Sequence, residues 1–502
     1  MVRAFSLSVP FRPLIAGLAL AGLGLLILGI AACGRRSEGP LPIVLIGDST
    51  ALDSSGVRLS PAARTLRGAT VEGLVAFDAE GHIVPAIADR WIITDDGESY
   101  IFRLRDGTWP GGARITAETA AAALQAALAR LKGTALGLDL ASIEQVRVMA
   151  DRVIEIDLSG PVPDLLTLLA QPELGLPYAR RGSGPMAIAR RSDGIELALI
   201  PPEKRGLVPE EGFTSHGRPL IVEFLPAPKA VKRFNDGDAD LVLGGRIDSL
   251  PLAEATSLAR GNVQLDPVVG MFGLLVESEA GFLADAPNRE ALALAIDRDA
   301  IIAAFNIGGW QPTTRIVSPG IEGDPGTVGE RWVGVALEAR RALAAQRVAK
   351  FMSGGKSAPV LRIAAASGPG TRRVIDRLAA DFKAIGVVAV QVGEDKPAEL
   401  RLIDTTARYG RVSWFLNQLA CSVHKPACSP LADDLLAEAR RTADMPERAR
   451  LLGQAVAEIT TANAYIPIAR PLRWSLVRSG VTGFAPNPWG WHPLPPLAVV
   501  PR

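Results

Sequence analysis

The sequence has almost no net charge and few His and Cys residues. Its 54 Lys and Arg balance 53 Asp and Glu, which leaves a formal net charge of +1. Without a basic surplus the chain lacks the charge pattern of a nucleic-acid-binding protein, so we expect no nucleic-acid partner. With four His and three Cys we also expect neither a bare-metal site nor another cofactor. A metal chelate held by Arg and Trp stays an alternative.

The scarcity of His also argues against an enzyme. Residues 46–49 read Ile-Gly-Asp-Ser, which resembles the nucleophile block of GDS-type esterases. In those enzymes a downstream His, supported by an Asp three residues before it, activates the serine. None of the four His has Asp at that spacing, and a serine without a supported base is inert. We therefore predict no catalytic residue and keep the esterase as a minor alternative. The four His are His82, His216, His424 and His492.

Only one apolar run approaches the length of a membrane span. Residues 14–32 are apolar or Gly, follow Arg3 and Arg12, and end in the letters IAACG. Small residues before a cysteine form the lipobox of bacterial lipoproteins, so we predict a signal peptide over residues 1–32 and lipidation of Cys33. An uncleaved membrane anchor is the alternative. Both place the rest of the chain outside the cytoplasm, and we expect a lipoprotein of the periplasm or cell envelope.

The other two cysteines predict a disulfide. Once Cys33 carries lipid, Cys421 and Cys428 remain as a pair in an oxidising compartment. The closed loop is short, so the bond would add roughly 2–3 kcal/mol. His424 lies between the two cysteines, and a metal site is an alternative for which no fourth ligand is evident.

The composition is that of a globular protein with more than one domain. Apolar residues make up 48% and charged residues 21%, and the length of 502 residues predicts two or three domains. Residues 360–364, 371–385 and 387–392 follow the order strand, helix, strand with short links. That order predicts a parallel α/β layer.

Local signals predict several further elements. Asp95-Asp96-Gly97 is a strong turn signal, so we predict a hairpin of strands 91–94 and 100–104. Residues 42–46 and 71–77 are predicted as strands. Polar residues before apolar periodic segments predict helix N-caps. These predicted caps are Thr116, Asn288, Asp297 and Asp444.

Five stretches carry a family resemblance through their order and spacing. They read VEGLVAFDAEGHIVPAIADRWIITDDGESYIFRLRDGTW (71–109), ARITAET (113–119), GSGPM (182–186), FNDGDADLV (234–242) and REALALAIDRDAIIAAFNIGG (289–309). Together they resemble the family 5 extracellular solute-binding proteins, the periplasmic peptide-, nickel- and opine-binding components of ABC importers. Each motif alone is weak, and their order across most of the chain makes the resemblance specific.

The resemblance implies a class II periplasmic-binding-protein fold of the α/β class. Two lobes joined by a hinge close over a ligand, and an extra subdomain is inserted in the first lobe. We assign lobe one to residues 33–65, 186–270 and 471–502, the inserted subdomain to 66–185, and lobe two to 271–470.

The resemblance also implies a function. A monomer would capture a small solute in the cleft between the lobes, either a peptide or a peptide-like or anionic compound. It would then deliver this solute to the permease subunits of an ABC transporter. The alternative is an envelope lipoprotein that uses the same fold as a sensor or assembly factor.

One segment departs from the peptide-binding members of the family. Those members carry an Asp-Tyr-Pro-Asp-Pro segment whose acidic residue pairs with the amino group of the ligand. Residues 401–428 stand in that place without the Asp-Pro, and the letters RYGR occupy residues 408–411. A cation there suits a carboxylate or phosphate, so we hypothesise that Arg408 or Arg411 contacts an anionic group.

The remaining candidate ligand-binding residues come from three places. Asp48, Ser49 and Thr50 follow the first strand, where ligands of α/β proteins often bind. Trp414, Asn417 and Gln418 would give an apolar wall beside amide groups. Tyr409 and, from the inserted subdomain, Trp109 complete the set. By contrast, we expect Arg473, Trp474 and residues 489–492 (Trp-Gly-Trp-His) to attach the C-terminal segment to lobe one.

Overall fold

The computed structural model describes residues 39–53, 56–109, 111–178, 182–209, 217–254, 261–353 and 355–500. The chain divides into two compact units, Met1–Pro40 and Leu41–Arg502, and the fold described below is that of the second unit. The predicted signal peptide (1–32), Cys33 and His216 lie outside the described residues. Within the described residues, each helix is too short or too polar to cross a membrane.

The first sheet has seven strands and mixes parallel with antiparallel pairs. Its central strand pairs in parallel with one neighbour on each side, and the outer strands run antiparallel. In spatial order the strands are β12 (Val263–Asp266), β18 (Arg473–Val477), β11 (Leu241–Gly245), β1 (Leu41–Ile46), β10 (Leu220–Leu225), β9 (Ile195–Leu199) and β8 (Met186–Arg190). The associated helices are α2 (Pro61–Thr70), α7 (Ala227–Asp236) and α8 (Leu250–Glu254).

The second sheet has five strands. In order they are β15 (Val388–Gly393), β14 (Val360–Ala365), β16 (Leu400–Thr406), β13 (Gly270–Val276) and β17 (Tyr465–Ala469). Strand β14 is parallel to both of its neighbours, which confirms the predicted parallel α/β layer. The helices of this part of the chain are α9 (Ala286–Ala295), α10 (Arg298–Ala303), α11 (Leu337–Met352), α12 (Pro369–Lys383), α13 (Val412–Gln418), α14 (Pro430–Arg441) and α15 (Met445–Ala462).

A four-stranded antiparallel sheet forms the third part. Its order is β4 (Ala88–Ile93), β5 (Ser99–Leu104), β7 (Val153–Leu158) and β6 (Ile143–Ala150), with the small hairpin β2 (Val75–Phe77) and β3 (Ile83–Pro85) nearby in sequence. Its helices are α3 (Ala117–Leu131), α4 (Ala135–Asp139) and α5 (Leu165–Leu169). Short 3₁₀ helices are η1 (Ser49–Asp53), η2 (Pro172–Leu174), η3 (Pro202–Arg205), η4 (Gly281–Ala284) and η5 (Pro495–Ala498).

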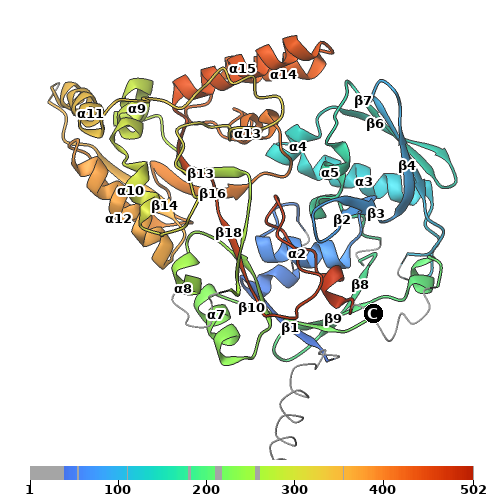
Figure 1. The fold of residues 1–502 in the computed structure, drawn as a ribbon. Helices are drawn as coiled ribbons and strands as arrows, with labels where there is room; N and C mark the ends of the chain where they lie inside the picture. Colours follow the sequence, from blue (N-terminus) through green and yellow to red (C-terminus); the bar gives the residue numbers. More distant parts are fainter. Residues whose placement is uncertain are drawn as a thin grey trace, which may run out of the picture. The chain divides into compact units, whose positions relative to one another are not determined.

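Each sheet draws its strands from one of the three predicted parts, although the exact domain boundaries stay a prediction. Two crossings link the first two sheets: β12 leads into β13, and β17 leads into β18. These are the connections that a two-lobed molecule needs for a hinge. Figure 1 shows α14 beside α15 in this part of the chain.

Local signals account for most element boundaries. The Thr116 hydroxyl accepts a hydrogen bond from the Thr119 backbone and caps α3, as predicted. Asp297 and Asp444 cap α10 and α15 in the same way, as predicted. The predicted hairpin forms, with β4 antiparallel to β5.

Two local predictions were wrong. The N-cap of α9 is Asp285 rather than Asn288, because Pro287 fits the first helical turn and starts the helix earlier. The strand predicted over 71–77 begins only at Val75. Helix α2 runs to Thr70, and the Glu72 backbone is then taken by other partners: its N–H donates to the Ser183 hydroxyl at 2.9 Å and its carbonyl accepts from the Leu176 N–H at 2.8 Å.

The buried side chains gather into three clusters. One joins the inserted subdomain to α13, α14 and α15, so that Phe102 and Trp109 share a core with Trp414 and Leu436. A second lies between the five-stranded sheet and its helices and reaches α7 and α8 of lobe one. The third covers the other face of the seven-stranded sheet. Apolar packing thus connects lobe two both to lobe one and to the inserted subdomain.

The predicted disulfide is confirmed. Cys421 and Cys428 are bonded, with their Cα atoms 5.2 Å apart. His424 between them is hydrogen-bonded through Nε2 to the Val276 carbonyl at 2.8 Å. The loop between α13 and α14 is therefore tied both to itself and to β13.

Candidate functional site

A cavity of about 190 Å³ opens where the ends of strands from both lobes meet. Strand β1 contributes Ile46 at its carboxyl end, β11 contributes Gly244, and β16 contributes Thr406. The carboxyl ends of strands are where open α/β sheets bind ligands. We call this cavity the cleft site, and its remaining walls come from α2, from the loop after β11 and from residues 489–492.

A smaller cavity of about 20 Å³ shares Arg246 and Asp404 with the cleft site and extends it toward α12. There the backbone N–H of Gly370, in the first turn of α12, donates to the Asp248 carbonyl at 2.8 Å. Asp248 belongs to lobe one and Gly370 to lobe two. The two lobes are therefore in direct backbone contact at this edge of the site.

Two arginines share one carboxylate in the cleft site. Arg473 Nη1 lies 2.6 Å from Asp404 Oδ1, and Arg246 Nε lies 3.7 Å from Asp404 Oδ2. Both guanidinium groups also donate to the Asp404 carbonyl, at 3.1 and 3.0 Å. Burial alone would lower the pKa of Arg246, but the Asp404 and Asp248 carboxylates outweigh burial and raise it. The single Asp404 carboxylate is thus the acidic partner of both arginines.

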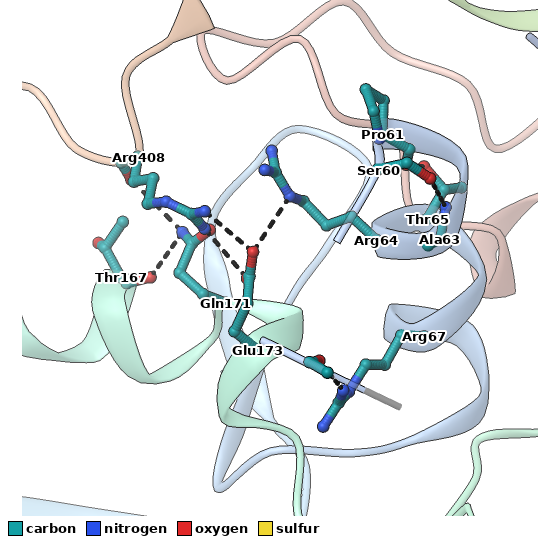
Figure 2. A network of polar contacts seen from close by, with 11 residues as sticks. Ser60, Pro61, Ala63, Arg64, Thr65, Arg67, Thr167, Gln171, Glu173 and Arg408 are labelled. Atoms are coloured by element: carbon teal, nitrogen blue, oxygen red, sulfur yellow. Dashed lines mark hydrogen bonds and ion pairs between the residues drawn. The ribbon is translucent and has the colours of Figure 1, made fainter. Parts of the chain in front are cut away.

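A second group of charges joins lobe one, the inserted subdomain and lobe two (Figure 2). Glu173, which is 1% exposed, receives Arg408 Nη2 at 2.9 Å and Nη1 at 3.0 Å and lies 3.5 Å from Arg64 Nε. Gln171 Oε1 also accepts from Arg408 at 3.0 Å. Figure 2 shows the terminal nitrogens of Arg64 turned away from Glu173.

The pKa values of Glu173 and Arg64 show that both side chains are charged at neutral pH. Burial would raise the pKa of the Glu173 carboxyl, but the Arg408 and Arg64 guanidinium groups hold it at about 2. Burial lowers the pKa of Arg64 to about 10, and the nearby charge of Arg408 acts in the same direction. Taken with the Asp404 group, the four guanidinium groups have three neighbouring carboxylates, those of Glu173, Asp404 and Asp248. The walls of the cleft site itself carry an excess of guanidinium groups, because Arg64, Arg246 and Arg473 line it with Asp404 as their carboxylate. An anion is the ligand that this excess favours.

The C-terminal segment, which sequence reasoning expected only to attach to lobe one, also lines the cleft site. Trp489, Trp491 and His492 are among its wall residues. His492 Nε2 lies 3.1 Å from Asp266 Oδ2, and Asn487 Nδ2 lies 3.3 Å from His492 Nδ1. Because the Asn487 amide nitrogen can only donate, Nδ1 accepts and the ring proton sits on Nε2. Held between these two partners, the His492 ring adds aromatic surface to the wall of the cleft site.

Several residues predicted for the ligand lie elsewhere. Asp48, Ser49 and Thr50 are exposed after β1, whose last residue in the cavity wall is Ile46. Trp109 is 1% exposed and stacks on Tyr178 with ring centroids 5.4 Å apart. Trp414 is also 1% exposed and packs edge-on against Phe415. In this conformation neither indole has free surface for a ligand.

The segment around residues 408–418 contacts the inserted subdomain. The Tyr409 hydroxyl and Asn417 Nδ2 both donate to Asp139 Oδ1, at 2.8 and 2.6 Å. Arg411 pairs with Asp164, so both arginines that were predicted to meet an anionic ligand have acidic partners within the protein. Gln418 is the last, half-buried residue of α13.

Sequence reasoning missed Arg64, Arg246, Asp404 and Arg473 as site residues. Arg246 directly follows strand β11 and Asp404 is near the end of β16, so the rule applied to Asp48 could have found them. Arg64 lies within helix α2, and no signal in the sequence separates it from other helical arginines.

Asp139 provides a test of the contact between α4 and α13. Burial raises its pKa to about 6, although Asn417 and Tyr409 both donate to it. Because this pKa is above the usual 3.8, the neutral acid is favoured in the fold. The contribution of Asp139 to stability is therefore complete below pH 4 and is lost as the pH rises through 6.

We expect Asp139→Asn to raise the free energy of unfolding at pH 7.5 by up to about 3 kcal/mol and to have little effect at pH 4. Asn keeps an oxygen that accepts from Tyr409 and Asn417. Thermal unfolding at both pH values measures this, with the exposed Asp89→Asn as control. An equal effect at both pH values would show that ionisation of Asp139 is not the cause.

The fold and the cleft together define a class of protein. Two α/β lobes are linked by two crossings, and a charged cavity with ligand-sized space lies where strand ends from both lobes meet. This is the architecture of a periplasmic-type binding protein. The model of the bacterial extracellular solute-binding proteins, family 5 (Middle), matches residues 82–191 and 218–417, more than half of the chain. The chain belongs to this family, whose members bind solutes and are not enzymes.

Individual relatives agree with this assignment. The probable deoxycholate-binding periplasmic protein YgiS of Escherichia coli (strain K12) is 28% identical over 289 residues, which cover 50% of this chain and 52% of that protein. The match thus spans about half the length of that relative. The periplasmic oligopeptide-binding protein OppA of the same organism is 22% identical over 463 residues, covering 82% of this chain and 84% of that protein.

A solved structure confirms the predicted fold class. The crystal structure of Haemophilus influenzae OppA in complex with RPPGFSPFR superposes with a TM-score of 0.78 at 18% identity. The superposition covers 92% of this chain and 99% of that chain. The chain therefore has the α/β class II periplasmic-binding-protein fold.

Proposed function

We propose that the protein captures a small anionic solute in the cleft site outside the cytoplasm and delivers it to the permease of an ABC transporter. The observation that carries this proposal is the excess of guanidinium groups in the cavity walls, where Arg64, Arg246 and Arg473 stand against the carboxylate of Asp404. Arginine recognises carboxylates and phosphates through paired hydrogen bonds. The aromatic side chains of Trp489 and Trp491 offer an apolar wall beside these charges.

The ligand that we propose differs from a peptide held by its amino group. In the peptide-binding members that the sequence resembles, an acidic residue near position 408 pairs with the ligand amine. Here Arg408 stands in that region and is itself bound to Glu173. A ligand amine would meet cations there, whereas a carboxylate could reach Arg64, whose terminal nitrogens point away from Glu173. Sugar acids, opines and acidic peptides fit this chemistry.

The remaining parts of the proposal rest on the sequence. We propose a monomer held at the membrane by lipid on Cys33, in the periplasm or cell envelope. Residues of the 408–418 segment would take part indirectly, because they hold the inserted subdomain against lobe two. The second candidate function is an envelope lipoprotein that senses or assembles without transport.

A ligand screen tests the proposal. We expect a thermal shift with anionic compounds in a panel of peptides, opines, sugar acids and metal chelates, because a ligand at a hundred times its Kd adds about 2.7 kcal/mol. Arg64→Ala should lower the affinity for the hit at least about tenfold, since it removes one charge-assisted contact and leaves Glu173 paired with Arg408. The half-exposed Arg191→Ala is the control.

Three outcomes would count against this function. A hit restricted to neutral or cationic compounds would contradict the anionic ligand. Unchanged affinity of Arg64→Ala for the hit would show that Arg64 does not contact the ligand. A panel without any shift would favour the non-transport envelope role.

A further inference from the structure

A second cavity, of about 120 Å³, lies between the inserted subdomain and the helices α13, α14 and α15. Within the described part of the chain it shares no wall residue with the cleft site. One wall comes from α4 and the segment before α5, and the other from lobe two. We call it the interface cavity. A molecule bound in it would touch both parts of the protein.

The walls of the interface cavity are largely apolar. Leu138 and Val162 of the inserted subdomain face Leu436 and Leu452 of lobe two across it. Most of its charged wall residues already have partners. Arg411 is paired with Asp164 and with Glu322, and Arg440 donates to the Asn417 side-chain oxygen.

Two buried polar atoms of the wall have no hydrogen-bond partner among the described residues. They are Asp139 Oδ2 and Arg448 Nη2. The side chain of Asp139 is buried, and its other oxygen already accepts from Tyr409 and Asn417. Arg448 uses Nε to donate to the Thr442 carbonyl at 2.9 Å, which leaves Nη2 free. Buried charged groups are rarely left in this state, because the lost hydration is not replaced.

The two unpartnered atoms have opposite roles. The Asp139 oxygen can only accept when the acid is ionised, and the Arg448 nitrogen can only donate. No ion pair within 4 Å joins these two side chains in the structure. A ligand that complements both must carry a donor cation and an acceptor anion, together with an apolar body for the leucine-rich walls. A free α-amino acid with an apolar side chain has this chemistry.

We propose that the interface cavity is a second ligand site, which binds a free apolar amino acid such as leucine. Its ammonium group would meet Asp139, its carboxylate would meet Arg448, and its side chain would pack among Leu138, Leu436 and Leu452. This site is independent of the solute proposed for the cleft, because the walls of the two cavities are separate. Since both the inserted subdomain and lobe two supply contacts, the bound amino acid would hold them together.

Calorimetric titration of the full chain with three matched probes tests this site. Leucine carries both charges, isoamylamine lacks the carboxylate, and 4-methylpentanoate lacks the ammonium group. We expect leucine to bind at least tenfold more tightly than either analogue. Asp139→Asn should weaken leucine and isoamylamine at least tenfold, and Arg448→Gln should weaken leucine and 4-methylpentanoate to a similar extent. Arg64→Ala, in the cleft site, should leave leucine binding unchanged.

The design separates this site from the cleft and from misfolding. Absence of leucine binding, or affinity unaltered by both Asp139→Asn and Arg448→Gln, would overturn the second site. Loss of leucine binding in Arg64→Ala would place leucine in the cleft and would also overturn it. Asp139→Asn is expected to be more stable at neutral pH, so its loss of binding would not reflect unfolding. If none of the anionic compounds in the panel binds, the proposal for the cleft site fails, and the proposal for the interface cavity is not affected.

Discussion

Glu173→Gln is expected to lower the free energy of unfolding by about 3–5 kcal/mol, the largest stability effect that we anticipate from a single charge change. Glu173 is buried and is the common partner of Arg64 and Arg408. The neutral amide cannot compensate two guanidinium groups, which would then repel each other in a place with little water. Denaturant unfolding at neutral pH measures the loss.

Three further measurements sharpen this prediction. The exposed Glu144→Gln is the matched control and should change stability by less than about 0.5 kcal/mol. The double variant Glu173→Gln with Arg408→Gln should recover part of the loss, because it leaves one unpaired cation instead of two. The effect of Glu173→Gln should shrink as the pH falls toward 2, since the pKa of Glu173 is held at about 2. A loss under 1 kcal/mol at neutral pH would show that water already solvates both arginines.

Gly370→Ala is expected to reduce affinity for the cleft ligand at least tenfold. A Cβ at this position would lie 1.8 Å from the Ile247 carbonyl oxygen of lobe one. That oxygen belongs to the backbone, and the backbone of residue 370 fixes the place of the Cβ, so no side-chain rotation relieves the clash. The lobes would have to separate, which would also break the bond from the Gly370 N–H to the Asp248 carbonyl. A ligand held between lobes loses affinity when the closed form is less populated.

Small-angle scattering and ligand titration together test this prediction. The variant should show a larger radius of gyration than the parent protein in the presence of ligand. Gly308→Ala is the control, because a Cβ there meets nothing within 4 Å. Normal affinity and normal compaction in Gly370→Ala would mean that the contact between α12 and lobe one is not part of the ligand-bound form.

The fold could be predicted because its signals are local or follow from the family motifs. Caps such as Thr116 and Asp444 mark helix starts through the few residues that follow them. The order of strand, helix and strand after residue 360 was enough for the parallel layer. The errors at Asn288 and in the strand predicted over 71–77 arose where a nearby proline or a distant serine changed a local preference.

The site was harder to predict because its geometry depends on distant pairs. Glu173 and Arg408 are 235 residues apart, and Asp139 and Tyr409 are 270 residues apart. A pattern within one segment can identify an arginine as unusual, but it does not show which distant carboxylate pairs with that arginine in the fold. The sequence singled out Arg408 as a departure from the family pattern, but it did not reveal that Glu173 of the protein itself is the acidic partner of this group.

The Arg408–Glu173 pair also constrains which substitutions the sequence can accept in evolution. Without Glu173 of the inserted subdomain, Arg408 would lose its acidic partner, and without Arg408, Glu173 would keep Arg64 alone as its cation. A lineage that changes only one of them passes through a less stable protein. A change of charge at either position therefore needs a matching substitution in a separate part of the chain if the stability of the protein is to be kept.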